Sequence, residues 1–181
     1  MILLLPDADV IIDLHSLNLW DRITRIHKVY IPSIILHKEV YRYPDLQGNY
    51  HTIHLADQIG KTITEISCEA SELLEFSKRF DFAFQTEIHE GEKEALILLK
   101  KKDQLRFCTC DKSAIIALAL LDLVDRGISF EKLLKISGIS TQQIEYKHTE
   151  KYFRHWAREG SIMKIQGRGI SSNKSKRTRT K

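Results

Sequence analysis

MILLLPDADVII, residues 1–12, places an apolar run directly before two aspartates, Asp7 and Asp9. The apolar run at residues 2–5 predicts a buried β-strand, and the spacing of apolar residues over 10–26 predicts helical structure after it. A carboxylate at the end of a buried element is costly unless a cation lies close to it. Asp7 therefore marks a position where the fold needs a counter-charge.

Three more acidic residues lie beside hydrophobic runs: Glu39, Glu92 and Asp111. Glu39 falls in a helical pattern that follows a short predicted strand, and Glu92 lies near the start of a helix predicted at residues 90–101. Asp111 directly follows the strand predicted at residues 106–110. If the fold gathers these acids around Asp7, their natural counter-ion is a hard divalent metal with oxygen ligands.

Short apolar runs alternate with helical patterns along the chain, which predicts an α/β domain. Further strands are expected at residues 29–31, 62–67 and 128–129, and a loop is expected at residues 44–51. Further helices are expected at residues 33–41, 69–80, 115–124, 130–136 and 141–158. Sites in open parallel sheets form beyond the carboxyl ends of the strands, so we expect Asp7 and Asp111 to meet at one edge.

Composition limits the class of protein. Of 181 residues, 43% are apolar and 29% charged, as in ordinary globular domains. No apolar run approaches the roughly 20 residues that cross a bilayer. Residues 1–6 have no basic leader, so we expect a cytoplasmic protein without membrane contact. Cys68, Cys108 and Cys110 lack zinc-ligand spacing, and Cys108 and Cys110 are expected to be small core residues.

The net charge of +4 is unevenly distributed. Residues 160–181 hold seven Lys or Arg and no Asp or Glu, so the rest of the chain is slightly acidic. Such a segment is expected to be flexible and suited to phosphate contacts, although a terminus that only aids solubility is an equally good interpretation. The candidate RNA-binding residues are Arg154, Arg158, Lys164, Arg168, Lys174, Lys176, Arg177 and Arg179.

The order of these motifs resembles the PIN-domain ribonucleases, the family that includes VapC-type toxins. The resemblance covers roughly residues 1–136. It rests on DADVI at residues 7–11, on Glu39 in the helix after a strand ending in Pro32, and on GEKEAL at 91–96 and TCDK at 109–112. It implies a three-layer α/β/α domain at residues 1–136 with a mostly parallel central sheet. The C-terminal helical extension expected at 137–159 and the basic tail at 160–181 lie outside the resemblance and are expected from the sequence pattern alone.

The resemblance also implies a function: a metal-dependent endoribonuclease that hydrolyses RNA, the toxin of a toxin–antitoxin pair. Asp7, Glu92 and Asp111 would hold Mg²⁺ or Mn²⁺, and Glu39 would act as a fourth catalytic acid directly or through water. Residues in supporting roles would be Asp9, Glu94 and Thr109. The implied partners are the RNA substrate, an antitoxin protein and a second copy of the chain.

Plainer interpretations stand beside this one. Asp7 and Asp111 are also good helix N-caps, Glu92 suits the first turn of a helix, and Glu39 suits an exposed surface. A different class of function is a non-catalytic PIN-like module that binds RNA through its basic tail. The DAD sequence at residues 7–9 also resembles the haloacid-dehalogenase phosphatases. That family expects Thr or Val where Ile11 stands, and a later pair of aspartates is missing.

Overall fold

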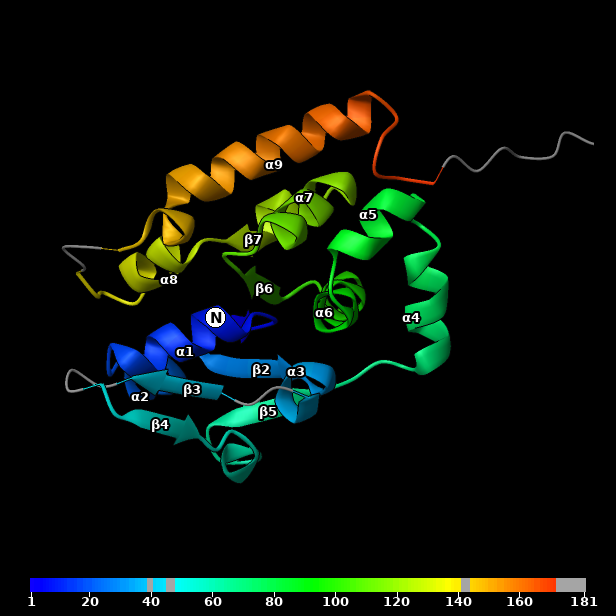
Figure 1. Ribbon diagram of the computed structural model, residues 1–181. Coiled ribbons are helices and arrows are strands. Elements are labelled where there is room, and N and C mark those ends of the chain that lie inside the picture. Colours follow the sequence, from blue (N-terminus) through cyan, green and yellow to red (C-terminus); the bar gives the residue numbers. More distant parts are fainter. Residues whose placement is uncertain (39–40, 45–47, 141–143, 172–181) are drawn as a thin grey trace, which may run out of the picture.

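The computed structural model describes residues 1–38, 41–44, 48–140 and 144–171. In this part of the chain, a five-stranded parallel sheet has the order β5-β2-β1-β6-β7 and helices flank it (Figure 1). Its strands are β1 (Ile2–Leu4), β2 (Lys28–Pro32), β5 (Ile63–Ile66), β6 (Leu105–Cys108) and β7 (Gly127–Ile128). The expected α/β architecture is confirmed.

The central strand β1 shows why the chain begins with a continuous apolar run. Leu3 and Leu5 belong to one hydrophobic core, and Leu4 belongs to a second core on the opposite face of the sheet. Successive strand residues point to opposite faces, so a strand covered on both sides is apolar at every position. All three leucines are fully buried.

The helices form two layers around this sheet. The first core contains residues of α1 (Ala8–Ser16), α2 (Trp20–Ile26), α3 (Ser33–Lys38) and α8 (Phe130–Ile136). The second core contains residues of α4 (Ala70–Ser77), α5 (Phe82–Glu87), α6 (Glu90–Lys101) and α7 (Lys112–Leu120). Short 3₁₀ segments are η1 (Ala56–Gln58), η2 (Val124–Arg126) and η3 (Tyr146–His148).

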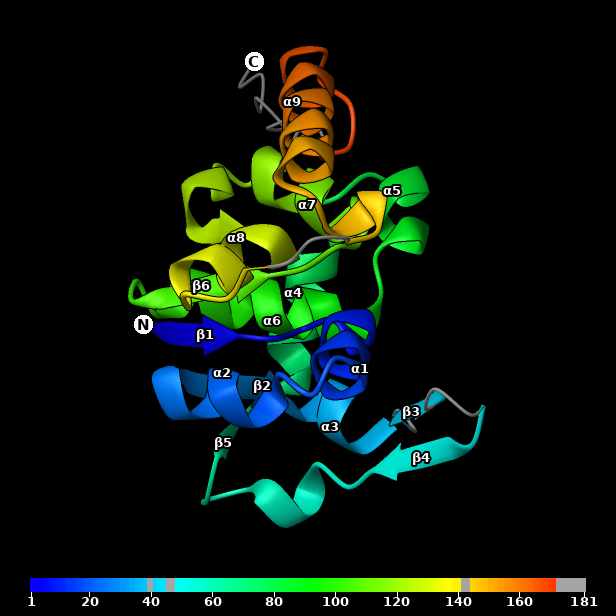
Figure 2. The ribbon, with the colours of Figure 1, turned by 90° about the vertical axis from the view of Figure 1, so that its left-hand side faces the viewer.

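The last helix, α9 (Glu150–Ile165), lies along α7 (Figures 1 and 2). Its close approach depends on Gly160, where an added Cβ would lie 2.8 Å from Cβ of Ala119 and 2.9 Å from the carbonyl oxygen of Ile116. Lys112, at the start of α7, lies against Trp156 of α9, and Asp122, just after the end of α7, contacts Lys164 further along α9. The two helices therefore run in the same direction.

The C-terminal boundaries differ from the prediction. The helix expected at residues 141–158 begins at Glu150, because the side chain of Thr149 caps it by accepting from the Tyr152 N–H at 3.1 Å. It also continues past the expected boundary at 159/160 to Ile165, and Ile170 then forms a β-bridge with Phe80. Residues 141–143 and 172–181 lie outside the described residues.

A β-hairpin occupies the segment that was expected to end a helix and continue as a loop. It pairs β3 (Tyr41–Pro44) with β4 (Tyr50–Ile53) and stands apart from the main sheet beside α1 (Figure 2). The ring of Tyr43 stacks between His51, at 5.4 Å, and His15 of α1, at 6.2 Å. This tertiary stack explains why a turn-rich sequence forms strands here.

Two smaller differences concern helices. The helical pattern over residues 10–26 is split into α1 and α2, with Asn18 at a positive φ of 53° between them. Helix α5 was not predicted; its N-cap is Asp81, whose side chain accepts from the Phe84 N–H at 2.9 Å. None of the described helices combines the length and apolar character that a membrane crossing requires.

Candidate functional site

The candidate site lies where the order of the sheet reverses. From the central strand β1 the chain proceeds outward through β2 and β5, and it then returns to β6 on the other side of β1. Ligands of open α/β folds bind at this switch point, beyond the carboxyl ends of the strands. A cavity of about 370 Å³ lies here, and Asp7, Asp9, Glu92 and Asp111 line it.

Asp7 is fixed by hydrogen bonds to both of its carboxylate oxygens. Oδ1 accepts from the Asp9 N–H at 2.9 Å, which makes Asp7 the N-cap of α1. Oδ2 accepts from the Thr109 hydroxyl and from the Cys110 N–H, each at 2.9 Å. The N-cap interpretation is therefore correct but incomplete, because the same side chain also ties α1 to the segment after β6.

Asp111 caps the neighbouring helix α7. Its Oδ1 accepts from the Ala114 N–H at 2.9 Å and from the Ser113 hydroxyl at 2.6 Å. The Asp111 N–H donates to the Thr109 hydroxyl oxygen at 3.0 Å, so one threonine connects the two aspartates. Thr109 was expected to hydrogen-bond an acid of the site, and it does.

Glu92 is the most enclosed of the acids, with 5% of its surface exposed. Its Oε2 accepts from the His89 N–H at 3.0 Å and lies 3.3 Å from the Ser113 hydroxyl. Burial first, and then the charge of Asp111, raise the pKa of Glu92 to about 9. Without a cation beside it, this carboxyl is therefore protonated at neutral pH.

The cations that line the cavity are engaged elsewhere. Lys147 Nζ pairs with Asp9 Oδ2 at 2.7 Å, and Lys112 Nζ lies 4.3 Å from the centre of the Trp156 ring. Within the described residues, no Lys or Arg pairs with the three acids Asp7, Glu92 and Asp111. These three carboxyl groups around one cavity thus have no counter-charge from a Lys or Arg of the described residues.

A set of three close ligand atoms, all within 4.8 Å of one another, belongs to Asp7, Asp9 and Cys110. Two of its members suit a hard cation poorly. The Cys110 thiol donates to Asp7 Oδ2 at 3.2 Å, and burial first, then the charge of Asp7, raise the pKa of this thiol so that it stays neutral. Asp9 is already paired with Lys147. Asp7 is then the oxygen ligand that this set offers.

The wider set of Asp7, Glu92 and Asp111 fits Mg²⁺ or Mn²⁺ better. All three are carboxyl oxygens around the same cavity, and Mg²⁺ prefers oxygen ligands and retains several of its waters. Their ligand oxygens do not all lie within 4.8 Å of one another, so these side chains would have to shift to bind one ion directly. The donor chemistry therefore favours these three residues.

Of the two other predicted acids, Glu94 lies outside this cavity, and Glu39 is not among the described residues. Glu94, expected as an outer ligand, is 1% exposed and accepts from the Ser33 hydroxyl at 3.1 Å and from the N–H groups of Ile34 and Cys68 at 2.9 and 3.2 Å. That expectation is wrong, since this carboxylate instead anchors the start of α3.

The four predicted RNA-binding residues that the structure describes, Arg154, Arg158, Lys164 and Arg168, lie outside the acidic cavity. Arg154 pairs with Glu150 at 2.5 Å, Lys164 contacts Asp122, and Arg158 is exposed on α9. Arg168 lies 3.4 Å from Gln166. The others, Lys174, Lys176, Arg177 and Arg179, lie outside the described residues.

Sequence reasoning missed several side chains that line the acidic cavity or support its acids. Ser113 could have been found, because it lies two residues after Asp111 in the first turn of α7. His89 could have been found as the residue before the first turn of α6. Lys147 and Tyr152 come from the C-terminal extension, and nothing local in the sequence places them beside Asp9 and Asp111.

Comparison with models of known protein families, with curated proteins and with solved structures finds no match in any of the three. The chemistry of this site therefore has to be inferred from its own residues.

Proposed function

We propose that this protein is a metal-dependent endoribonuclease of the PIN type, in which Asp7, Glu92 and Asp111 hold Mg²⁺ or Mn²⁺ and the substrate is RNA. The observation that carries the proposal is the meeting of these three carboxyl groups, from distant parts of the chain, around one cavity at the switch point of a parallel sheet. Helix capping alone accounts for Asp7 and Asp111. The capping box of α6 accounts for the contact of Glu92 with the His89 N–H, but not for the burial of this carboxyl beside two other acids, which raises its pKa.

Each residue then has a defined task. Thr109 and the caps of α1 and α7 hold Asp7 and Asp111 in fixed orientations. Glu92 would release its proton on binding a divalent cation, because the charge of the cation favours the ionised carboxylate against burial and the charge of Asp111, which together raise its pKa. A bound Mg²⁺ or Mn²⁺ supplies charge for the phosphate oxygens and lowers the pKa of a bound water.

Lys147 has a different role in this proposal. Its ammonium lines the cavity and pairs with Asp9, so it neutralises one of the four acids there and lessens their repulsion of an RNA phosphate. The role as a toxin, the antitoxin partner and the homodimer remain predictions from the resemblance.

The experiment is cleavage of single-stranded RNA by the full chain with Mg²⁺ or Mn²⁺. Removing one metal-binding carboxylate forfeits several kcal/mol of transition-state stabilisation, so Asp7→Asn and Asp111→Asn should each slow cleavage by at least about a hundredfold. Asp122→Asn is the matched control, because Asp122 is exposed and contacts Lys164 at the other end of α7. Cleavage that survives both site substitutions, or that persists in EDTA, would remove the proposal.

A further inference from the structure

A second region, at the other end of α6 and α7, is lined by cations. Two adjoining cavities of about 390 and 660 Å³ lie where the end of α4, the C-terminal turn of α6 and the segment after α9 come near one another. Both are lined by Glu75, Arg79 and Lys100. Glu92 precedes Lys100 by eight residues of α6, about 12 Å along the helix axis, so this region is distinct from the acidic cavity.

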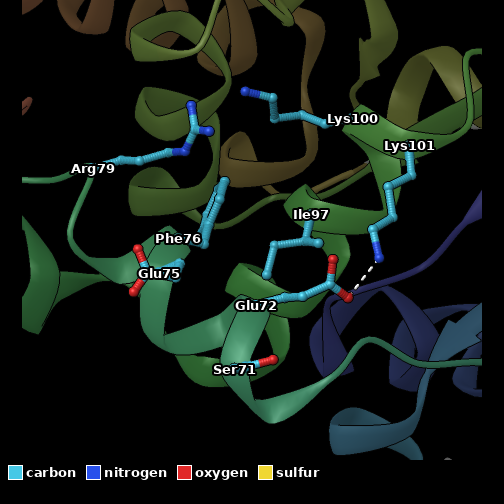
Figure 3. A pocket seen from close by; sticks show the side chains of 8 residues that line it. All are labelled: Ser71, Glu72, Glu75, Phe76, Arg79, Ile97, Lys100 and Lys101. Atoms are coloured by element: carbon cyan, nitrogen blue, oxygen red, sulfur yellow. Dashed lines mark hydrogen bonds and ion pairs between the residues drawn. The ribbon is translucent and has the colours of Figure 1, made fainter.

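Arg79 and Lys100 point into the same space. Figure 3 shows the guanidinium of Arg79 and the ammonium of Lys100 extending over the first cavity, whereas Lys101 turns to Glu72. The other cations around the two cavities are paired: Lys78 with Glu75 at 2.5 Å, Lys101 with Glu72 at 2.5 Å, and Lys164 with Asp122. In the described parts of the chain, no carboxylate pairs with Arg79 or Lys100.

Holding these two charges together is unfavourable for the protein alone. The pKa of Lys100 is lowered, first by desolvation and then by the positive charge of Arg79. Favourable placement of cations at helix ends explains why lysines lie at the end of α6. It does not explain why the guanidinium of Arg79 and the ammonium of Lys100 lie near each other without a paired carboxylate, whereas Lys78 and Lys101 each pair with one.

Both side chains start from well-fixed backbone. The carbonyl of Arg79 accepts from the Ser171 N–H at 2.8 Å, and the carbonyl of Phe80 accepts from the Ser171 hydroxyl at 2.8 Å. One residue further, Asp81 accepts from the Gly169 N–H at 2.6 Å. Lys100 lies in the last turn of the 12-residue helix α6. The segment after α9 therefore holds one wall of the site in place.

We propose that Arg79 and Lys100 form a binding site for a phosphate group, carried by a free nucleotide or by the backbone of a nucleic acid. A guanidinium presents paired N–H donors that match two phosphate oxygens, and an ammonium adds a point charge. Beside the cations, the first cavity is lined by the apolar side chains of Phe76 and Ile97 and by two acids, Glu72 and Glu75, which pair with Lys101 and Lys78. Its volume lies in the range of sites that enclose small molecules.

The test is titration of the isotope-labelled full chain with inorganic phosphate at constant ionic strength in EDTA, followed by NMR. The amides of Arg79, Lys100 and Ser171 should shift together. Charge-assisted hydrogen bonds contribute roughly 1.5–3 kcal/mol each, so the Arg79→Gln/Lys100→Gln double variant should bind phosphate at least about tenfold more weakly. The charge-matched control is Lys132→Gln/Lys135→Gln, on exposed positions of α8, which should bind as the wild type does.

Two further arms identify the source of the phosphate. Tighter binding of adenosine monophosphate than of inorganic phosphate assigns the site to a nucleotide. Tighter binding of a short single-stranded RNA, with no gain from the mononucleotide, assigns it to a nucleic-acid backbone. Because EDTA prevents metal-dependent cleavage, a protein without nuclease activity would give the same binding result.

Thermal unfolding shows whether the double variant binds phosphate more weakly only because it is less well folded. Without phosphate the double variant should melt no lower than the wild type, since it loses a repulsion, and only the wild type should gain stability when phosphate is added. Equal phosphate affinity in the double variant and the wild type would overturn the proposal. So would an equal loss in the α8 control, because binding would then reflect net charge alone.

Discussion

At the residue scale, Glu92 is where protonation and stability are most directly coupled. Its pKa is raised from an ordinary 4.5 to about 9, by burial first and by Asp111 second. Between these two pH values the metal-free folded chain binds a proton that the unfolded chain has released. The contribution of this carboxyl to stability is therefore complete below about pH 4.5 and is lost as the pH rises toward 9.

This coupling predicts the behaviour of Glu92→Gln, which imitates the protonated side chain. In EDTA at pH 8 the variant should be more stable than the wild type by at least about 1 kcal/mol, because one pKa unit corresponds to about 1.4 kcal/mol. The difference should shrink at pH 5. Urea unfolding at the two pH values measures it, and Glu87→Gln, at an exposed position of α5, is the control. A variant that is no more stable than the wild type at pH 8 would show that Glu92 is ionised in the metal-free fold.

At the scale of elements, η3 joins the C-terminal extension to α1 through two neighbouring side-chain contacts. Lys147 pairs with Asp9, and His148 Nε2 lies 2.7 Å from Asp13 Oδ2. Asp9 and Asp13 are four residues apart and so lie on one face of α1. The ring of His148 is also buried against Phe130, at 5.0 Å between ring centres. These contacts of Lys147 and His148, which we call the η3 clasp, hold Lys147 beside the acidic cavity.

We expect His148→Ala to lower the free energy of unfolding by about 2–4 kcal/mol, because it leaves Asp13 without its partner and opens a cavity beside Phe130. Denaturant unfolding of the full chain measures this change. His54→Ala, at an exposed position after β4, should stay within about 0.5 kcal/mol of the wild type. Similar values for the two variants would mean that the clasp contributes little to the fold.

Local sequence signals predicted some elements correctly and missed others. Helix α6 has the predicted bounds, because its apolar stripe and the acids in its first turn act within the helix itself. The hairpin of β3 and β4 was missed, since it depends on the stack of Tyr43 with His15, a contact across the chain. The position of Lys147 depends in the same way on a distant partner, Asp9.

At the scale of the whole molecule, the packing of α9 on α7 joins the extension to the core. Gly160→Ala would place a Cβ 2.8 Å from Cβ of Ala119 and 2.9 Å from the Ile116 carbonyl. We expect a loss of about 1–3 kcal/mol in the free energy of unfolding, as for other overpacked sites. Arg158→Ala, on the exposed side of α9, is the control. An unchanged stability in Gly160→Ala would mean that α9 packs less closely on α7 than described.

The rule for parallel sheets is also what made the site predictable. Asp7 and Asp111 each follow a strand, and those strands are neighbours, so their side chains meet at one edge as expected. The rule says nothing of side chains that reach the edge from a helix that does not directly follow a strand. Glu92 reaches the cavity, whereas Glu94, two residues later, faces α3 instead. Packing between helices decides which of these two glutamates faces the cavity, and the local sequence pattern does not predict that packing.

The central claim is that Asp7, Glu92 and Asp111 together bind a divalent metal. The most direct measurement is anomalous diffraction from crystals of the full chain soaked in Mn²⁺, for the wild type and for Asp111→Asn. We predict a strong anomalous peak among the three carboxyl groups of the wild type and its loss in the variant. A saturating Mn²⁺ soak that leaves this cavity without a peak, or a peak that Asp111→Asn does not diminish, would contradict the account.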